Sequence, residues 1–442
     1  MNCATMFSML DIKYIRENPE KVQTNTVNKG FQNLSVKELL ALDADKRDLQ
    51  AQVDELREQR NAIAAKMKGG KPEQALVDKG KQIKIQLAER EEYLRKTDEK
   101  FLELLKKFPN MALDSVPVGH SEEESVVTKT VGNPPKFDFT PLSHAELAEK
   151  RGWLDAVRAT KIAGSRFVYV KGDLARLEFA LWQFCIDTLT NQDKIREIIA
   201  GAGLTDRISD KPFIFVLPPA VATTAVFEAT GRLNKTEQTY KIEDEDLWLN
   251  ASAEHTLSPM YMDEILDEKD LPIRLLGYTT AFRREAGTYG KDTEGMFRLH
   301  QFNKMEMESF TDTKTSFDEH LFMVAIQEYL MAALELPYRV LEKCTFDIGR
   351  PNAKGVDVEV WLPSQKKYRE THTADYITDF QARAMRTRVR RADGTLELAH
   401  TNDATAYSER PLIAILENFQ NQDGTVAVPN VLQPYLGDKK VL

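Results

Sequence analysis

The segment AFRREAGTYGKDTEGMFRLHQFNKMEMESF, Ala281 to Phe310, concentrates charged residues in a pattern that predicts a β-hairpin. Successive side chains on a strand point to opposite faces, so Arg283 and Glu285 share one face of the first predicted strand. One face of the return strand carries a mixed set of side chains: Arg298, His300, Phe302, Lys304, Glu306 and Glu308. The opposite face carries Phe297, Leu299, Met305 and Met307. The apolar face therefore predicts packing against helices, and the charged face predicts the wall of a cleft.

The competing interpretation is a solvated outer face of an antiparallel sheet. Two features favour the cleft. The charged face mixes cations, carboxylates and one aromatic ring instead of repeating Lys and Glu, and the connecting loop contains Gly287, Gly290 and Gly295. Such a face can hold an anion, stack a flat ring and receive an ammonium group, which are the chemical parts of ATP and an amino acid.

A second charged pair, Glu409 and Arg410, opens the segment SERPLIAILENFQ. Pro411 suits a first helical turn, and the following apolar residues predict a buried helix. An unpaired guanidinium at the edge of a core is costly, so Arg410 is expected to meet a phosphate group. A buried carboxylate partner is the alternative.

The elements that would position these residues predict an α+β domain. A capping box at Ser143 and Glu146 opens a predicted helix over 143–164, and an apolar helix follows at 174–190. Strands are predicted at 213–219, 247–257, 273–287, 296–310, 355–363 and 368–375. Their hairpin-like connections favour a mostly antiparallel sheet flanked by helices. Because neither GxxxxGK[ST] nor GxGxxG after a strand is present, a bound nucleotide would have to be held without a P-loop.

Before this domain, apolar residues recur in alternating steps of three and four, which predicts an antiparallel coiled-coil hairpin at about 36–108. The first seam runs through Leu39, Leu42, Lys46, Leu49, Val53, Leu56, Arg60, Ile63 and Met67. After the helix-breaking GGKP at 69–72, the second runs through Leu76, Ile83, Leu87, Leu94, Phe101, Leu104 and Phe108. Each arm of roughly 30 residues would be about 45 Å long. A spacer or dimerisation coil and an arm that binds a long substrate both fit this pattern.

Composition sets the broad class. The 442 residues exceed one ordinary core, and 42% hydrophobic with 29% charged residues is typical of a folded protein without a membrane span. Cys3, Cys185 and Cys344 form neither a CxxC pair nor a disulfide framework, so we expect a reducing, cytoplasmic setting and no zinc site. The net charge of −9 argues against generic polyanion binding. We predict two domains, 1–120 and 121–442, with a linker after Pro109.

Motif 2 of the class II aminoacyl-tRNA synthetases resembles three segments of this chain: FRRE, the glycine-bearing loop and HQFNKMEM. Their residues are most similar to those of the seryl-tRNA synthetase family. The resemblance covers nearly the whole chain: MLDIKYIRENPEKV at the start of the family's homology, EATGRLNK near motif 1, SAEHTL as its TxE segment and ILENFQNQDGTVAVPNVLQPYLG after motif 3. It marks residues 1–8 as an extension. It implies an antiparallel class II sheet, a homodimer and an N-terminal arm for tRNA(Ser). It also implies serine activation by ATP, then transfer to the tRNA.

The resemblance also implies residue roles. Attack of a carboxylate on the α-phosphate concentrates negative charge, so arginines and Mg²⁺ are the expected stabilisers, with no organic cofactor. Arg283 and Arg410 would be catalytic, at the α-phosphate and the distal phosphates. Glu285 would bind the adenine amino group, Phe302 would stack on adenine, and Glu370 would hold ATP with its metal. Arg284, Leu299 and Thr373 complete the implied ATP site.

For serine, the resemblance implies Ser252, Ala253, Glu254, Arg283 and Glu306. Ser252 replaces the family's Thr, and Thr373 its usual Ser. The segment HTNDATAYSERP departs further: a one-residue deletion places either Asn402 or Asp403 at the position of the family's Asn, with Thr405 as the expected hydroxyl, and Glu409 and Pro411 flank the motif 3 arginine. The amino-acid pocket is therefore where this chain differs most from the family pattern.

Two other functions are compatible with parts of the sequence. A synthetase paralogue could activate an amino acid for a non-tRNA acceptor, although the long regular arm favours tRNA. A non-catalytic coiled-coil protein is the other alternative, but it gives no reason for Arg283, Glu285, Glu306 and Arg410 to occur together. The sequence leaves open whether tRNA(Sec) is also a substrate.

Overall fold

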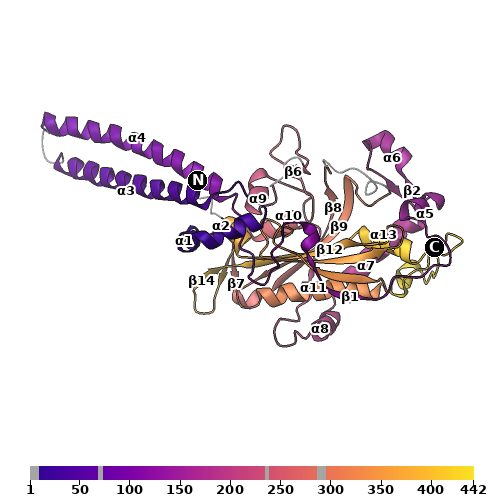
Figure 1. Cartoon of the computed structure of the whole chain (residues 1–442). Helices are drawn as coiled ribbons and strands as arrows, with labels where there is room; N and C mark the ends of the chain where they lie inside the picture. The colour runs from indigo at the N-terminus through magenta and orange to yellow at the C-terminus, as the bar shows by residue number, and fades with distance from the viewer. Residues whose placement is uncertain (1–8, 68–72, 234–237, 286–294) are drawn as a thin grey trace. The chain divides into compact units, whose positions relative to one another are not determined.

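The computed structural model describes residues 9–67, 73–233, 238–285 and 295–442. The chain divides into two compact units, Met1–Met111 and Ala112–Leu442. In Figure 1 the first unit is indigo to purple and the second runs from magenta to yellow.

The N-terminal unit contains helices α1 (Ile12–Glu17), α2 (Pro19–Asn28), α3 (Val36–Lys66) and α4 (Gln74–Leu105). The two long helices lie antiparallel, which confirms the predicted hairpin (Figure 1). Their buried apolar residues are Val36, Leu39, Val53, Ile63, Ile83, Leu87, Phe101 and Leu105. Leu105 is buried where Leu104 was expected, so the second seam is shifted by one residue at its end. The predicted break at 69–72 lies outside the described residues.

The seam accepts a lysine because the opposite helix supplies its partners. Lys46 Nζ lies 2.5 Å from Asp98 Oδ1 and 4.8 Å from the centre of the Phe101 ring. A carboxylate and an aromatic face both favour the ammonium group. Lys46 therefore interrupts the apolar pattern without leaving an unpaired charge in the seam.

The second unit is built on a mainly antiparallel sheet, as predicted. Among the described residues its eight strands follow the order β1-β10-β11-β12-β15-β9-β8-β4, and β4 alone pairs in parallel, with β8. In that order their bounds are Val126–Val131, Tyr338–Glu342, Lys354–Leu362, Lys367–Thr378, His400–Ser408, Gln301–Thr311, Ile273–Phe282 and Ile214–Val216. Side chains alternate between two covered faces of this sheet.

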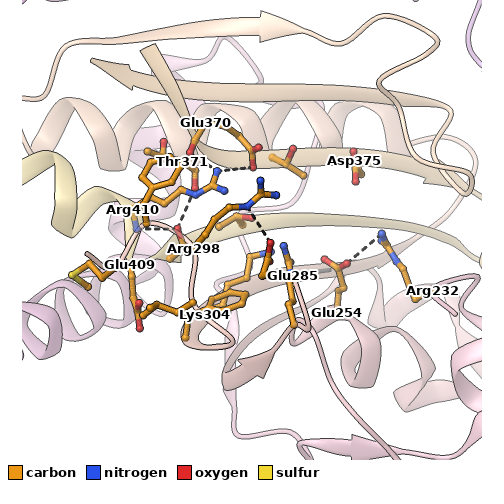
Figure 2. Close-up of a pocket in the computed structure, with 18 residues that line it drawn as sticks. Arg232, Glu254, Glu285, Arg298, Lys304, Glu370, Thr371, Asp375, Glu409 and Arg410 are labelled. Atoms are coloured by element: carbon orange, nitrogen blue, oxygen red, sulfur yellow. Dashed lines mark hydrogen bonds and ion pairs between the residues drawn. The ribbon is translucent and has the colours of Figure 1, made fainter. Parts of the chain in front are cut away.

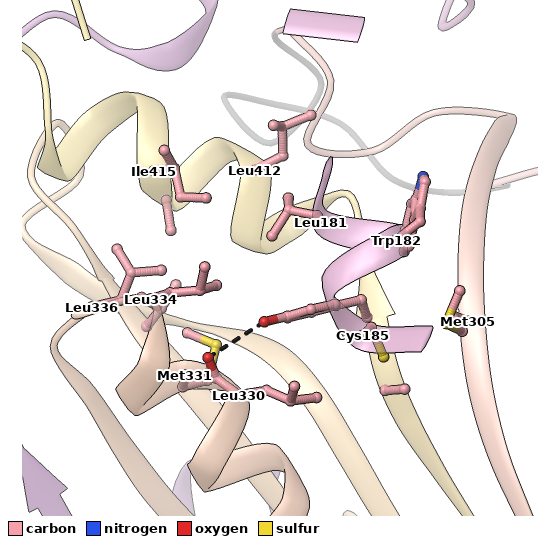
Figure 3. Close-up of a cluster of buried hydrophobic side chains, with 14 of the residues drawn as sticks. Leu181, Trp182, Cys185, Met305, Leu330, Met331, Leu334, Leu336, Leu412 and Ile415 are labelled. Carbon is pink, nitrogen blue, oxygen red and sulfur yellow. Dashed lines mark hydrogen bonds between the residues drawn. The ribbon is translucent and has the colours of Figure 1, made fainter. Parts of the chain in front are cut away.

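One face packs against α7 (Gly172–Leu189), α8 (Gln192–Gly201), α11 (Ser316–Ala333) and α13 (Arg410–Asn418). Figure 3 shows this core, in which Met305 of β9 lies on the side of Trp182 and Cys185 of α7. Tyr407 donates a hydrogen bond from its hydroxyl to the carbonyl of Leu330, at 3.3 Å. Met305 and Met307 are fully buried here, which confirms the predicted apolar face of the return strand.

Shorter elements surround the sheet. They are α5 (His144–Lys150), β2 (Leu154–Asp155), α6 (Ala156–Ala163), β3 (Tyr169–Val170), β5 (Val221–Ala222), α9 (Thr224–Ala229), β6 (Trp248–Leu249), α10 (Glu254–Leu257), β7 (Ile265–Asp267), α12 (Phe380–Met385), β13 (Arg388–Arg390) and β14 (Leu396–Leu398). The capping box at Ser143 and Glu146 forms as predicted. None of the helices in the described ranges combines the length and apolarity that crossing a bilayer requires.

Several predicted elements were wrong in extent. The hairpin strands end at Phe282 and begin at Gln301, so Arg283, Glu285, Arg298 and His300 lie beyond them. The predicted strand over 247–257 is the short β6 followed by α10, and the predicted helix over 143–164 is interrupted by β2. The predicted linker contains the edge strand β1. Strand β15 was not predicted, because it is rich in polar residues and lacks the apolar alternation of a half-buried strand, although it is buried on both faces.

Candidate active site

A cavity of about 200 Å³ opens over the side of the sheet away from α7 and α11. Figure 2 shows its two ends: Arg410 and Glu409 lie at one, and Glu254 and Arg232 at the other. The lining residues are Arg232, Glu254, Arg283, Glu285, Met296, Phe297, Arg298, Leu299, Phe302, Lys304, Glu370, Thr371, Thr373, Asp375, Thr405, Ser408, Glu409 and Arg410. Phe302 and Lys304 of β9 therefore line a cleft, as predicted for the charged face, whereas Glu308 is buried against Ser258 and does not line it.

Arg410 is positioned by the start of α13, where Pro411 stands in the first turn. Its Nη1 donates to the carbonyl of Glu370 at 2.6 Å and lies 3.4 Å from Glu370 Oε1. Its guanidinium also lies over the Phe297 ring, 5.2 Å from the ring centre. Half of the Glu370 side chain is exposed in the cavity, so its carboxylate is open to solvent and not the deeply buried partner considered above.

Arg283 follows β8 and folds over the aromatic ring of Phe302, 5.1 Å from the ring centre. Its Nε donates to the carbonyl of Ala251 at 3.2 Å, and its backbone is paired with that of His300. Glu285 has a φ of 47°, and its Oε2 accepts from Arg298 Nε at 3.1 Å. These contacts place a cation, a carboxylate and an aromatic ring around one space.

At the other end, Glu306 is fully buried beneath Lys304 on β9. Its Oε1 accepts from the hydroxyl of Ser252 at 3.0 Å and from that of Thr405 at 3.3 Å, and it pairs with Lys304. Its Oε2 has no hydrogen-bond partner among the described groups. A buried carboxylate oxygen without a partner is unfavourable, and a ligand that donates a hydrogen bond from an ammonium or hydroxyl group would satisfy it.

Glu254 reaches the cavity from the first residue of α10, and Arg232 pairs with it, Nη1 to Oε1, at 3.2 Å. Arg232 also pairs, through Nη2, with Asp403 of β15. Burial would raise the pKa of Glu254, but Arg232 and then Lys304 oppose it and lower that pKa to about 2. Glu254 is therefore an anion at neutral pH despite being nearly enclosed.

The other acidic groups differ in charge state. Burial raises the pKa of Glu306 against the opposing effect of Lys304, and burial with the nearby Glu178 raises the pKa of Glu409 to about 8. For Glu370, the partial burial that would raise the pKa is outweighed by Arg410 and Lys343, so its pKa falls to about 2 although half of the side chain is exposed. The Arg410 end of the cavity thus offers an ionised carboxylate beside a guanidinium.

Most predicted site residues meet in this cavity. Nine of them line it: Glu254, Arg283, Glu285, Leu299, Phe302, Glu370, Thr373, Thr405 and Arg410. Ser252 and Glu306 lie just beneath, in hydrogen-bond contact with each other, while Ala253 is fully buried in a small core with Leu257. Arg284 is not among the lining residues; its backbone N–H donates a hydrogen bond to the carbonyl of Gln238.

Asn402 does not line the cavity. Its amide donates to the carbonyl of Ser316 at 3.1 Å, on the face of β15 opposite to Asp403 and Thr405. Of the two residues left open by the one-residue deletion, Asp403 is therefore the one on the Glu254 side of the sheet, where it pairs with Arg232. Arg232 and Asp375 also belong to this end and were not predicted, because a single arginine in a loop and one strand aspartate carry no periodic signal.

Comparison with known proteins agrees with this geometry. A family model described as the tRNA synthetase class II core domain (G, H, P, S and T) matches residues 237–419, so the sheet and its cavity are those of a class II synthetase core. A second, described as the seryl-tRNA synthetase N-terminal domain, matches residues 9–112. The chain belongs to the seryl-tRNA synthetase family.

Individual relatives match over nearly their full length. The chain is 39% identical to a serine–tRNA ligase of Pseudothermotoga lettingae, over 97% of this chain and 99% of that protein. It is 40% identical to one of Thermotoga petrophila, with the same shares of each chain. The crystal structure of seryl-tRNA synthetase from Pyrococcus horikoshii complexed with ATP superposes with a TM-score of 0.87 at 36% identity, covering 98% of this chain and 99% of that one.

Proposed function

We propose that this chain is a serine–tRNA ligase: it activates L-serine with ATP and transfers the seryl group to tRNA(Ser). In the first step a serine carboxylate oxygen attacks the α-phosphorus of ATP and the bond to pyrophosphate breaks, giving seryl-adenylate. In the second, a ribose hydroxyl of the terminal adenosine of the tRNA attacks the seryl carbonyl and AMP leaves. The observation that carries the proposal is a single cavity lined by Arg283, Arg410, the Phe302 ring and the carboxylate of Glu254, in a chain of this family.

The phosphate end supports the first step through charge. Arg283 would hold the α-phosphate and Arg410 the distal phosphates, so both cations act where negative charge develops. Phe302 would stack on the adenine, with Arg283 moving from the ring to the phosphate. Glu285, held by Arg298, would accept from the adenine amino group, and Arg284, Leu299 and Thr373 would complete the site.

Mg²⁺ fits the same end. It favours oxygen ligands and is usually held by one or two carboxylates together with substrate phosphates. Glu370 supplies an ionised, half-exposed carboxylate beside Arg410. The ion would neutralise phosphate charge when bound with ATP. Arg410 keeps the Glu370 side chain oriented toward the cavity.

The amino-acid end supports recognition of serine. Glu254 would pair with the ammonium group, and Arg283 would orient the carboxylate for attack. Glu306 and Thr405 would bind the hydroxyl. An amino acid without that hydroxyl would leave Glu306 Oε2 unpaired in a buried site, which is how such a pocket rejects alanine.

The tRNA acceptor, the dimer and the location complete the proposal. The hairpin of α3 and α4 would bind tRNA(Ser), and we infer a homodimer from the family. Sedimentation at the monomer mass would contradict the dimer. A cytoplasmic location is supported by Cys185 and Cys344, which are both buried free thiols.

The test is serine-dependent exchange of labelled pyrophosphate into ATP. Arg283→Ala should lower the exchange rate about 10²- to 10³-fold, since it removes a preorganised cation from the reacting phosphate. Arg207→Ala is the control, because Arg207 pairs with Asp318 on the surface and should leave exchange unchanged. Exchange with another amino acid but not with serine would contradict the substrate, and exchange without transfer to tRNA would indicate a paralogue with another acceptor.

A further inference from the structure

Arg232 connects two acidic residues that come from distant parts of the chain. Its Nη1 lies 3.2 Å from Glu254 Oε1, and its Nη2 pairs with Asp403. The Arg232 side chain is 15% exposed and that of Asp403 is 1% exposed. Figure 2 shows Arg232 reaching toward Glu254 at the end of the cavity away from Arg410.

Asp403 is the central member of a row of carboxyl groups that crosses the sheet. It faces Asp375 of β12 on one side and Glu308 of β9 on the other, and all three are buried. Directly opposed residues of neighbouring strands bring their side chains within about 5.5 Å. One oxygen of each, Asp375 Oδ1, Asp403 Oδ1 and Glu308 Oε1, has no hydrogen-bond partner among the described groups.

This row fixes where the guanidinium must lie. Burial and the neighbouring carboxyl groups raise the pKa of Glu308 and Asp403 well above their usual values, so the anion of the central carboxyl group needs a cation beside it. Arg232 fills that role with one end of its guanidinium fork and leaves the other end for Glu254. A planar fork with two ends can hold two carboxylates at a defined separation, which a lysine cannot do.

We propose that Arg232, anchored by Asp403, is a positioning residue that holds Glu254 in place for the ammonium group of the amino acid. The inference rests on the proposed function, because it assigns Arg232 to the ammonium site of that reaction. Arg232 acts through Glu254 and sets the affinity for the amino acid, while the nucleotide end of the cavity does not depend on it.

The surroundings of Glu254 give a second readout. The groups of basic or titratable type that face it are Arg232, Lys304, His255 and Arg283. Its acidic neighbours are Glu306, Glu308, Asp375 and Asp403. The backbone N–H of Ala251 donates to His255 Nδ1 at 3.3 Å, so the neutral ring presents its other nitrogen, 3.7 Å from Glu254 Oε1. Without Arg232, burial and the acidic neighbours would protonate Glu254 at higher pH.

The experiment measures serine-dependent pyrophosphate exchange of the full chain for Arg232→Gln, Arg232→Lys and Asp403→Asn. Arg232→Gln should raise the KM for serine at least tenfold and leave the KM for ATP within twofold. The acid limb of kcat/KM for serine should also move up by at least one pH unit. Arg232→Lys keeps the positive charge but lacks the two-ended guanidinium. Compared with Arg232→Gln, it should therefore return the acid limb part of the way toward wild type and lower the KM for serine only slightly.

Asp403→Asn guards against a variant that simply fails to fold. It keeps the shape of the side chain and leaves Arg232 paired with Glu254, so the protein should still fold, as denaturant unfolding would show, yet the KM for serine should rise. A matched buried ion pair away from the cavity, Arg274 with Glu319 at 2.5 Å, provides the control: Arg274→Gln should lower stability without a selective rise in the KM for serine.

The outcomes separate cleanly. Equal rises in KM for serine and ATP, or an unchanged KM for serine in a folded Arg232→Gln protein, would overturn the positioning role. A wild-type chain without serine-dependent exchange would instead overturn the proposed function itself.

Discussion

Two guanidinium groups lie over the same aromatic ring at the nucleotide end of the cavity. Arg369 and Arg410 are 4.4 Å and 5.2 Å from the centre of the Phe297 ring. Arg410 also contacts Glu370 and lines the cavity, whereas Arg369 bonds to the side chain of Gln365. The two arginines share the stacking contact and differ in their access to a phosphate.

That difference gives a paired prediction. Arg410→Ala should raise the KM for ATP about tenfold to a hundredfold, because a hydrogen bond to a charged group contributes about 1.5–3 kcal/mol. Arg369→Ala removes a stacked arginine from the same ring and should change that KM by less than about twofold. Steady-state pyrophosphate exchange at varied ATP measures both. Equal effects of the two variants would mean that the ring, and not the phosphate, accounts for the role of Arg410.

At the scale of single residues, the sequence predicted which charged residues belong to the site better than it predicted the residues that they contact. Arg283, Glu285, Glu306 and Arg410 could be chosen because charges in a strand pattern or beside an apolar helix need an explanation. The contacts between Arg232 and Asp403 could not be predicted, because they join a loop and a strand that are 171 residues apart. Only the folded sheet brings such residues together.

At the scale of the elements, the backbone path of residues 295–300, just before β9, depends on Gly295. Gly295 has a φ of 64°, and a Cβ at this position would lie 2.5 Å from His144 Nε2 and 2.9 Å from the Cβ of Ala145. His144 is itself held by Glu417 of α13, Nδ1 to Oε1, at 3.0 Å. The glycine therefore lets the chain pass close to the start of α5 before it lines the nucleotide end.

Gly295→Ala should displace residues 296–299 from the cavity wall. We expect a loss of stability of more than about 1–2 kcal/mol, the cost of the left-handed backbone alone, and a several-fold higher KM for ATP. Gly394→Ala is the matched control: its φ is 85°, but no atom lies within 4 Å of the added Cβ. It should lose stability through the backbone alone and keep its KM for ATP. Denaturant unfolding and exchange kinetics measure the two effects, and a normal KM for Gly295→Ala would contradict this account of the loop.

The class of the two coiled-coil helices and of the hairpin strands could be predicted from periodicity, whereas their ends could not, and α11 and β15 were not predicted. The return strand reads as a strand from Met296 to Phe310, yet it begins at Gln301 because the backbone before it turns to face the cavity. In the same way, Glu254 begins a short helix where alternation suggested a strand. At both places the chain departs from its local pattern at residues that line the cavity, where side-chain position outweighs regular pairing.

At the scale of the whole molecule, the N-terminal hairpin is a long element whose buried seam continues into its outer part through Ile63, Ile83 and Leu87. Arg57 Nη2 on α3 lies 2.9 Å from Glu91 Oε1 on α4, so the two helices are directly opposed at this level. The buried residues Leu39, Val53, Phe101 and Leu105 lie on the side of this pair toward the helix ends at Val36 and Leu105. A short turn that joins Arg57 to Glu91 would therefore shorten the arm while it keeps most of the seam.

Deletion of residues 58–90, with a short glycine linker in their place, separates the two reactions. Serine-dependent pyrophosphate exchange should remain within about twofold of wild type, because every group assigned to adenylation lies in Ala112–Leu442. Charging of tRNA(Ser), measured in parallel on the same preparation, should fall by at least about a hundredfold, since the arm would supply contacts worth about 3 kcal/mol or more. A spacer or dimerisation coil predicts something different: charging would survive shortening, or exchange and charging would fall together. The exchange assay is thus the internal control for folding, and the ratio of the two activities shows whether the arm binds the tRNA.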